Sequence, residues 1–525
     1  MFKKLFSILT VSLLIMSAIP FASFANEALT VSAVNAPGGN VTTVDELISA
    51  LGGNGITYQN GVISVIKDIV LSSSVNITSG TYTIIGEGAS IKGDFDGDLF
   101  VLSGEGTLLT LGDLAAIENK SDLVFDGGNT VREGSIFRVE QGANLEMHNS
   151  VVIKNAATSV SGAAIYNNGE FTMYGGEIEN CRASSSGGAI YSEGELTLAS
   201  GYIENCSANH GGAVYSECKS ALIGIKISSC KATNGGAIFN AGEMQYQGAT
   251  VTECSASKGG AIYNSGKAVI SGGAINNNKA ENGDGGGIFT SSELELSGWV
   301  VTDNSAKNGG NIYNNGSVTT GASFAVVGGT AAENGGNIYN GELGIFTQSS
   351  GAVNLGKAVY GGGVYNLGTY NLGAGIYANQ AQVGEGILNH GKVVLTDMGY
   401  CEKGDDIFVV LTPENKHAVV VAENWIYKKK PVYISSGIVS DGVYSYSHSA
   451  GNKLLDIKGR IDADKRFMLH KSNTGLVLKN DGTLKKAPTP ISKTLITVIC
   501  IIIAYPVVTA AIVFAIRYFD KKKLA

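Results

Sequence analysis

The stretch Gly187-Gly188-Ala189-Ile190-Tyr191 decides the fold, because the chain repeats it at an almost constant spacing. The aromatic position recurs every 24 to 26 residues between Tyr166 and Tyr365, and Leu388 takes the next place. A unit of this length cannot bury an apolar face alone, so a fixed period of this kind indicates units that stack on one another. The copies, in which Gly or Asn replaces Ala from the fifth onward, occupy residues 187–191, 211–215, 235–239, 259–263, 285–289, 309–313, 335–339 and 361–365.

Short apolar alternations lie between these marks, such as Glu195-Leu196-Thr197-Leu198 and Ala268-Val269-Ile270. Each is bounded by Gly, Asn or Ser, and two or three short strands in about 24 residues are typical of one coil of a solenoid. The sequence therefore predicts an all-β fold, a right-handed parallel β-helix, with equivalent residues of neighbouring coils about 4.8 Å apart.

A second position follows the same period, in the phrase aliphatic-x-x-Asn-x-Ala. The exchange of amide, thiol, hydroxyl and Gly at this place predicts a small corner residue. Disulfides between adjacent coils and a zinc site remain as alternatives for the cysteines, although side chains in one column point the same way instead of converging. The position is assigned to Asn155, Cys181, Cys206, Cys230, Cys254, Asn278, Asn304, Thr330, Gly356 and Asn379.

These marks resemble those of the polymorphic outer membrane protein family and related right-handed parallel β-helix surface proteins, namely Gly-Gly-Ala-Ile and Phe-x-x-Asn. The first stands at 187–190, 235–238 and 259–262, and the second is relaxed, as in Val301…Asn304. The resemblance covers residues 100–390 well and implies an adhesin. Such proteins end in a β-barrel translocator, whereas this sequence has no such region and no Leu-Pro-x-Thr-Gly wall-sorting motif.

Both ends of the sequence carry targeting features. Residues 1–25 are predicted to be a signal peptide, with two lysines, an apolar run and small residues at a cleavage site; a retained signal anchor is the alternative. Residues 494–516 are uncharged and long enough to span a membrane, and the Arg and Lys that follow predict a cytoplasmic tail over 517–525. We therefore expect a single-pass protein of the cell membrane with an extracellular ectodomain and a cytoplasmic C-terminus.

Between these ends the sequence divides by the strength of its repeat. Residues 26–98 are expected to form an N-terminal cap and the first coils, 99–390 the β-helix repeats, 391–485 closing coils or a β-rich cap, and 486–493 a linker. Asp45–Leu51 is predicted to be a short capping helix, because Thr43 and Glu46 have the spacing of a capping box and Gly52 would end it.

The charge of the expected exported part limits its partners. Residues 26–492 carry 30 Lys and Arg against 44 Asp and Glu, a net charge of −14. An acidic surface repels phosphate backbones, so nucleic acid is excluded as a partner. We expect no cofactor.

The aromatic position of the repeat is the candidate binding surface. The residue before it is always Ile or Val, which predicts that the aliphatic side chain faces inward and the ring outward. An exposed column of rings could stack on sugars or pack on a partner protein, and the alternative is a ladder that packs on itself and serves only stability. The candidate residues are Tyr191, Tyr215, Phe239, Tyr263, Phe289, Tyr313, Tyr339 and Tyr365.

The loop Asp94-Phe95-Asp96-Gly97-Asp98 resembles the start of a calcium loop, but Leu99 stands where such loops need Gly. A solvated turn is the better interpretation, which leaves Asp94, Asp96 and Asp98 as weak metal candidates, and no metal site is expected. Catalytic motifs of the His-Glu-x-x-His and Gly-x-Ser-x-Gly types are missing, and we expect no catalytic residues.

The leading hypothesis is a non-enzymatic, adhesin-like surface protein whose repetitive face binds a polysaccharide or a surface protein through many weak contacts. A carbohydrate-active enzyme on a β-helix, either a polysaccharide lyase or a hydrolase, is one alternative. A structural spacer in the cell envelope is the other.

Overall fold

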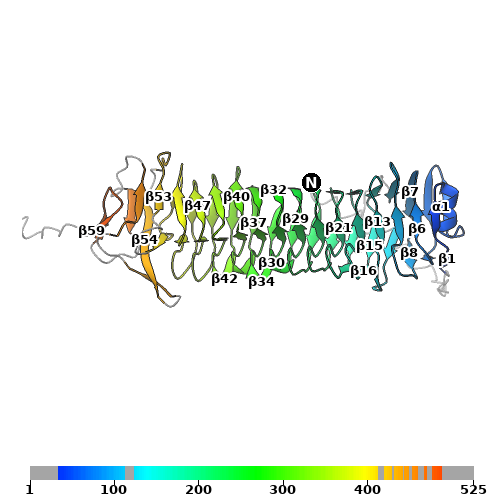
Figure 1. Ribbon diagram of the computed structural model, residues 1–525, viewed down its shortest axis with the longest axis horizontal. Helices are drawn as coiled ribbons and strands as arrows, with labels where there is room; N and C mark the ends of the chain where they lie inside the picture. Colours follow the sequence, from blue (N-terminus) through cyan, green and yellow to red (C-terminus); the bar gives the residue numbers. More distant parts are fainter. Residues whose placement is uncertain are drawn as a thin grey trace, which may run out of the picture.

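The computed structural model describes residues 33–112, 123–411, 419–427, 431–440, 443–447, 452–458, 466–469 and 476–486. They form a long rod of stacked coils, with the helix α1 (Val44–Ala50) at one end and the last strands at the other (Figure 1). Strands of successive coils pair in parallel, and the described residues complete about 14 turns. The predicted all-β parallel solenoid is thereby confirmed, while its right-handed sense stays a prediction.

Each coil passes through three sheets, which we call sheets B, C and A in the order in which the chain visits them. In one coil these are the strands β24 (Val214–Ser216), β25 (Lys219–Leu222) and β26 (Lys226–Ser228). Sheet A contains 15 described strands: β1 (Val34–Ala36), β5 (Ile69–Leu71), β8 (Ala89–Gly93), β11 (Leu123–Asp126), β15 (Val151–Lys154), β19 (Glu177–Glu179), β23 (Tyr202–Glu204), β26, β29 (Thr250–Thr252), β33 (Ala274–Asn276), β37 (Trp299–Thr302), β41 (Ala325–Val327), β45 (Ala352–Asn354), β48 (Gly375–Tyr377) and β51 (Tyr400–Cys401).

Sheet B carries the aromatic position of the repeat. Its strands pair in register, so that Tyr191 faces Tyr215 and Tyr215 faces Phe239. They are β2 (Gly39–Val41), β6 (Val75–Ile77), β9 (Phe100–Leu102), β13 (Phe137–Val139), β17 (Ile165–Asn167), β21 (Ile190–Ser192), β24, β27 (Ile238–Asn240), β31 (Ile262–Asn264), β35 (Ile288–Thr290), β39 (Ile312–Asn314), β43 (Ile338–Asn340), β46 (Val364–Asn366), β49 (Ile387–Asn389), β52 (Ile407–Val410), β54 (Val432–Ser440) and β57 (Phe467–Leu469).

Sheet C follows sheet B after a tight corner. Apart from the hairpin of its first two strands, its pairs are parallel. Its strands are β3 (Ile56–Gln59), β4 (Val62–Val65), β7 (Thr81–Gly86), β10 (Leu108–Leu111), β14 (Asn144–Met147), β18 (Glu170–Met173), β22 (Glu195–Leu198), β25, β28 (Glu243–Gln247), β32 (Lys267–Ser271), β36 (Glu293–Ser297), β40 (Ser317–Thr320), β44 (Ile345–Gln348), β47 (Thr369–Leu372), β50 (Lys392–Leu395), β53 (Val419–Val421) and β56 (Leu455–Ile457).

Short strands line the corner between sheet A and the next strand of sheet B. Isolated parallel bridges continue these ladders in the coils between them. The corner strands are β12 (Val131–Arg132), β16 (Ala157–Thr158), β20 (Arg182–Ala183), β30 (Ser255–Lys258), β34 (Lys279–Asp284), β38 (Ser305–Asn308) and β42 (Thr330–Asn334).

Alternation along each short strand builds a single core. In β24, for example, Val214 and Ser216 point inward and Tyr215 points outward. Inward Ile, Val, Leu and Phe side chains of the three sheets form one continuous hydrophobic cluster along the rod. A coil contributes only a few such side chains, so its stability comes from contact with its neighbours.

The helix α1 closes the N-terminal end of this core. Leu47 and Leu51 are fully buried. The Glu46 N–H donates to Thr43 Oγ1 at 3.3 Å, and the Thr43 N–H donates to Glu46 Oε2 at 3.0 Å. The predicted capping helix and its capping box are confirmed, with the helix starting at Val44 and ending at Ala50.

The C-terminal end is closed by antiparallel pairs. The strand β55 (Val443–Tyr446) folds back on β54, and β58 (Leu476–Leu478) pairs with β59 (Leu484–Lys486). Tyr444 of β55 packs against Tyr360 and Tyr365 at that end of sheet B.

The register corrects the predicted corner position at two places. Lys154 pairs with Glu179, which aligns Ala156, and not Asn155, with Cys181. Ser305 pairs with Thr330, which aligns Gly329, and not Thr330, with Asn304. A left-handed residue with φ near +55° precedes this position in most coils, as at Asn155 and Asn180, and it makes the turn into the corner. The coils differ by one or two residues in length, which caused the misalignment.

Within the described residues no helix is long and apolar enough to span a membrane. The predicted signal peptide over 1–25 and the predicted membrane helix over 494–516 lie outside the described residues, as does the linker after Lys486.

Candidate functional site

The predicted aromatic column forms a regular ladder on the outer side of sheet B. Ile190 and Val214, which precede two of its rings, are fully buried, whereas Tyr191 and Tyr215 are half-buried. From Tyr191 to Tyr365 neighbouring ring centroids are 4.6–5.2 Å apart, and the ring planes are inclined by 9–18°. The spacing of parallel strands imposes this stacking distance.

The stacking leaves the ring edges exposed but covers the ring faces. Each ring between the ends of the ladder has a neighbour on both sides. At one end the Arg138 guanidinium lies 4.3 Å from the centre of the Tyr166 ring, and Arg138 is held by Asp98 at 2.7 Å. At the other end the Tyr365 hydroxyl lies 2.8 Å from that of Tyr444. A sugar can therefore meet edges and hydroxyls of this ladder, but stacking on a ring face requires the ladder to open.

Carboxylates bind hydroxyls at the N-terminal end of the ladder. The Tyr191 hydroxyl lies 3.0 Å from Glu193 Oε1 and 3.2 Å from Glu217 Oε1, and it donates to these carboxylates. Burial and these two acids raise the pKa of Tyr191. The Tyr166 hydroxyl also donates to Glu193. These hydroxyls are therefore fixed in direction.

Shallow hollows follow one another along the outer face of sheet C. The middle hollow has a volume of about 350 Å³ and is lined by Glu195, Thr197, Lys219, Ala221 and Gln245, among others. The short side chain of Ala221 leaves room between the longer side chains of the neighbouring coils. Two further hollows, over β10–β18 and β32–β40, lie on the same sheet in line with it.

Charges of opposite sign alternate along the edge of these hollows. Glu243 pairs in register with Lys219 on one side and Lys267 on the other. Lys267 Nζ lies 3.8 Å from Glu293 Oε2, and both side chains are mostly exposed. The sequence analysis did not recognise this ladder, although Glu and Lys alternate at the start of successive sheet C strands; reading one strand position down the repeat would have shown it.

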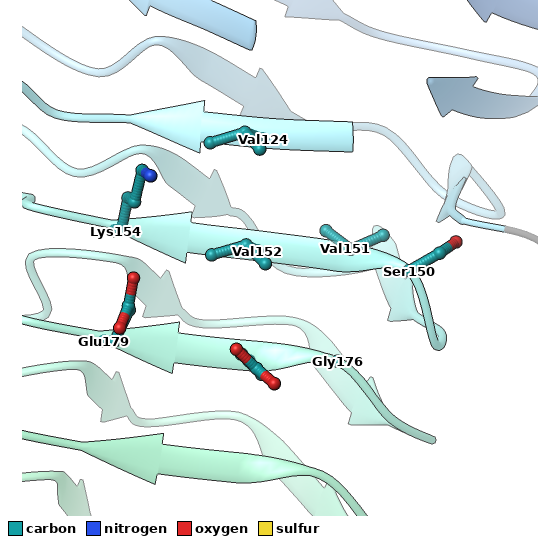
Figure 2. Close-up of a pocket in the computed structure, with 8 residues that line it drawn as sticks. Val124, Ser150, Val151, Val152, Lys154, Gly176 and Glu179 are labelled. Atoms are coloured by element: carbon teal, nitrogen blue, oxygen red, sulfur yellow. The ribbon is translucent and has the colours of Figure 1, made fainter. Parts of the chain in front are cut away.

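A separate hollow lies on sheet A between β11, β15 and β19. Figure 2 shows Val124 above Val152, with Lys154 and Glu179 extending from neighbouring strands beside them. Burial and the nearby Glu179 and Glu204 raise the pKa of Glu177, which also lines this hollow. Its apolar part is small, and no other hollow continues it along sheet A among the described residues.

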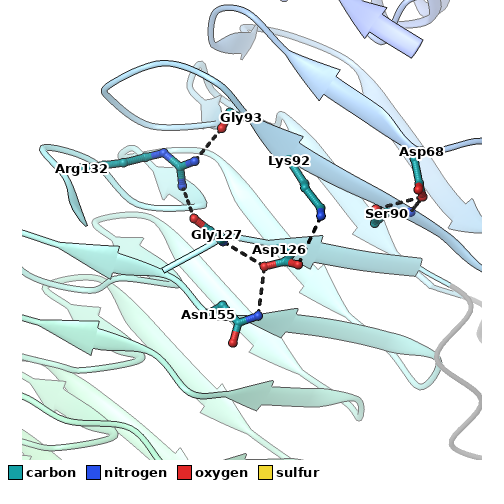
Figure 3. A network of polar contacts seen from close by, with 9 residues as sticks. Asp68, Ser90, Lys92, Gly93, Asp126, Gly127, Arg132 and Asn155 are labelled. Atoms are coloured by element: carbon teal, nitrogen blue, oxygen red, sulfur yellow. Dashed lines mark hydrogen bonds and ion pairs between the residues drawn. The ribbon is translucent and has the colours of Figure 1, made fainter. Parts of the chain in front are cut away.

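The acidic loop of the predicted weak metal candidates wraps around a buried cation. Arg132 donates to the carbonyl oxygens of Gly93, Gly127 and Phe95 at 2.6, 3.1 and 3.2 Å (Figure 3). Its side chain lies beneath the loop that carries Asp94, Asp96 and Asp98.

The carboxylates of this loop serve the following coil. Asp96 accepts from the Glu133 N–H at 2.6 Å, and Asp98 accepts from the Ser135 N–H and from Arg138. They meet separate partners instead of converging on one point. Among the described residues no group of three or more His, Cys, Asp or Glu side chains could hold a metal ion.

Asp126 links three coils of sheet A. Burial would raise the pKa of its carboxyl, but hydrogen bonds from the Gly128 N–H at 2.9 Å and Asn155 Nδ2 at 3.1 Å lower the pKa overall, together with Lys92 at 3.6 Å. Figure 3 shows these contacts beside the Asp68–Ser90 pair of the preceding coils. The network is structural.

The four stacked cysteines face the core as free thiols. Cys181, Cys206, Cys230 and Cys254 are at most 1% exposed, and each Sγ donates to the carbonyl oxygen two residues earlier at 3.2–3.3 Å. Burial raises the pKa of the Cys206 and Cys254 thiols. Cys218 and Cys401 are also free, and Cys500 lies outside the described residues.

Amides continue the cysteine column toward the C-terminal end. The Cys254 N–H donates to Asn278 Oδ1, and the Asn278 N–H donates to Asn304 Oδ1, both at 2.9 Å. The next two corner positions are Gly329 and Gly356, which have no side chain. There the third residue of the Gly-Gly phrase supplies the amide.

Asn311 and Asn337 fill the places that these two glycines leave empty. Asn311 Oδ1 accepts from Asn304 Nδ2 at 2.9 Å, and its Nδ2 donates to Asn337 Oδ1 at 2.8 Å. A Cβ at Gly329 would lie 2.8 Å from Asn311 Nδ2. The chain of amides ends where Asn379 donates to Asp405 Oδ1 at 2.8 Å.

Asp405 and Asp406 are buried where the last regular coils meet the closing strands. Asp405 is 2% exposed, and burial raises its pKa although the Asn379 N–H and Nδ2 donate to it. Asp406 accepts from the Glu385 N–H and from the Ser435 hydroxyl. Neither carboxyl opens onto any of the hollows described above.

Comparisons with known proteins found no match: no protein-family model, no curated protein and no solved structure matches this chain. The resemblance to polymorphic outer membrane proteins therefore rests on the repeated motifs alone.

Proposed function

We propose that this chain is an adhesin-like surface protein, anchored by its predicted C-terminal membrane helix, that binds an extended polymer along the rod. The observation that carries the proposal is the line of shallow hollows on the outer face of sheet C. Each hollow alone is open and holds little of a small molecule. Hollows that recur along a rigid rod suit a polymer, because weak contacts at linked sites add up.

The polar lining favours a glycan over an apolar protein surface. Thr197, Gln245 and Thr319 offer hydroxyl and amide groups at the bottom of the hollows, and Glu and Lys alternate at their edge. Sugar hydroxyls both donate and accept, as these groups require. The aromatic ladder stays a prediction as a second surface, through its exposed edges.

A polysaccharide-cleaving enzyme is the second candidate, because Lys219 stands between Glu195 and Glu243 at one hollow. Glu195 and Glu243 are two coils apart, or about 10 Å, close to the separation of the carboxyls in inverting glycosidases. The regular alternation of charge in the same column offers a plainer reason for these residues.

The test uses the full chain, purified in detergent, on immobilised wall, plant and host polysaccharides, with retention and product release scored together. Retention without product is expected. Ala221→Trp fills the middle hollow and is expected to lower retention, whereas Asn371→Trp, in the same outward column beyond the hollows, should not. Product release would favour the enzyme, and no retention on any polymer would refute both.

A further inference from the structure

One corner of the rod carries cations and no acid over four consecutive coils. This basic corner consists of residues 182–186, 207–210, 231–234 and 255–258, between sheets A and B. Arg182, Lys231 and Lys258 are exposed there, and the half-buried His210 lies among them. All other residues of these segments are Ser, Thr, Asn or Ala. In an ectodomain with a net charge of −14, this surface reverses the sign of the charge locally.

Cations and hydroxyls alternate in one column of this corner. Parallel bridges pair Arg182 with Ser207, Ser207 with Lys231, and Lys231 with Ser255. Arg182 and Lys231 are therefore two coils apart, which is about 10 Å. Charge spaced evenly along a straight line fits a linear polymer better than a compact ligand.

The cations of the basic corner are not neutralised by partners. Among the described residues, none of Arg182, Lys231 and Lys258 forms an ion pair with a carboxylate. The corner ends one coil later, where Lys279 pairs with Glu281 at 2.6 Å. On the other side, Glu204 and Glu253 lie before the corner, toward sheet A.

The basic corner adjoins the aromatic ladder. Lys258 Nζ lies 5.1 Å from the centre of the Phe289 ring, and the His210 ring meets the Phe239 ring edge-on at 5.4 Å. Asn234 Nδ2 lies 3.1 Å from His210 Nδ1. The cations are thus held beside a rigid aromatic surface, so that a ligand on the corner also reaches ring edges.

We propose that the basic corner binds a linear anionic polysaccharide that lies along the rod. Its acidic groups meet Arg182, Lys231 and Lys258, and its hydroxyls meet the serines between them. Sheet A and sheet C place acids on both sides, which repel a broad polyanion such as a nucleic acid duplex but leave a narrow chain in place. The inference shares with the proposed function only the assumption of a polymer ligand, since it concerns a different face.

The experiment compares immobilised polygalacturonate with its fully methyl-esterified form, which has the same sugar backbone without the charge. The full chain in detergent should bind the acid form, and rising salt should weaken the binding. The variant with Arg182→Gln, Lys231→Gln and Lys258→Gln should lose affinity roughly tenfold. The control variant carries Lys219→Gln, Lys267→Gln and Lys392→Gln, three exposed lysines of sheet C, and changes the net charge by the same amount.

The proposal is overturned if the esterified polymer binds as well as the acid, or if both triple variants lose affinity equally, since overall charge would then explain the binding. Circular dichroism checks that each variant keeps its β structure. Retention of neutral polymers that depends on Ala221 would support the sheet C surface while the basic corner fails. The two failures are therefore distinguishable.

Discussion

The inward corner residue of each coil determines how the polar interior of the rod is satisfied. Thiols occupy this position in four coils and amides in others, and each satisfies a backbone group of its own or a neighbouring coil. Where the position is Gly329 or Gly356, an Asn from the Gly-Gly phrase takes over. Two positions far apart in the repeat therefore share one space, and each constrains what the other can be.

This sharing gives a prediction that opposes the repeat pattern. Asn311→Ala restores the commonest form of the phrase, Gly-Gly-Ala-Ile, yet it removes the acceptor of the Asn304 N–H and side chain. We expect the free energy of unfolding to fall by about 1–3 kcal/mol, because buried polar groups lose their partner. Denaturant unfolding followed by circular dichroism measures the change.

Asn308→Ala is the matched control, since Asn308 lies in the same coil and bonds to Asp284 nearer the surface. Water can replace that bond, so the loss should be smaller. An Asn311→Ala protein as stable as the parent would show that the amide chain contributes nothing.

At the scale of elements, the closing strands are joined to the last regular coil through buried carboxyls. Asp405 occupies the end of the amide chain, and Asp406 binds Ser435 of β54. A carboxylate here accepts hydrogen bonds as an Asn would, but its charge is buried. The charged form is therefore the less stable one in this place.

We predict that Asp405→Asn stabilises the closing strands at neutral pH. Because the pKa of Asp405 is raised in the folded chain, its stabilising contribution is complete below the unfolded pKa of about 3.9 and is lost as the pH rises through the folded value. The difference between variant and parent should thus grow from pH 4 to pH 7. Thermal unfolding at several pH values measures it.

Asp456→Asn provides the contrast. Lys458 lies 2.7 Å from Asp456 and lowers its pKa, so this carboxylate contributes stability above its unfolded pKa. The change should weaken the protein slightly at pH 7 and not at pH 3. The same sign of effect for both variants would contradict the assignment.

The elements that the sequence predicted well are those with local signals. The capping box of α1 and the inward Ile and Val before each ring depend on neighbours in the chain. The identity of the corner position was assigned one residue off at Asn155 and Thr330, because coil lengths vary and only the register fixes the column. The role of Asn311 could not be seen, since its partner Gly329 lies in the next coil and carries no side chain.

The candidate surfaces were predictable to different degrees. The outward side of the aromatic ladder follows from alternation, but the covering of ring faces follows from the 4.8 Å spacing together with the side-chain angles that all rings share. The hollows of sheet C arise from short side chains such as Ala221 between longer ones. The basic corner joins residues from four coils, which the sequence separates by about a full period each.

At the scale of the whole molecule, stability is close to a sum over coils and their contacts. Residues 207–230 form one complete coil of 24 residues, because Ser207 and Lys231 occupy the same column. We predict that deletion of 207–230 keeps the fold and shortens the rod by about 4.8 Å. Small-angle scattering and circular dichroism test this.

Deletion of residues 207–218, half of that coil, is the control. It would join sheet A of one coil to sheet C of the next and break every column, so loss of β structure is expected. A protein that unfolds equally after either deletion would show that the coils are not independent units.

The direction of the hydrogen bonds has a mechanical consequence. Strands lie across the rod (Figure 1), so the bonds between coils point along its axis. A pull between the two ends loads these bonds directly, and the coils peel off in series from an end instead of shearing together. Each coil of 24 residues that peels off releases a thread of about 80 Å. A tether of this kind yields in steps under tension, and it lengthens greatly before it breaks.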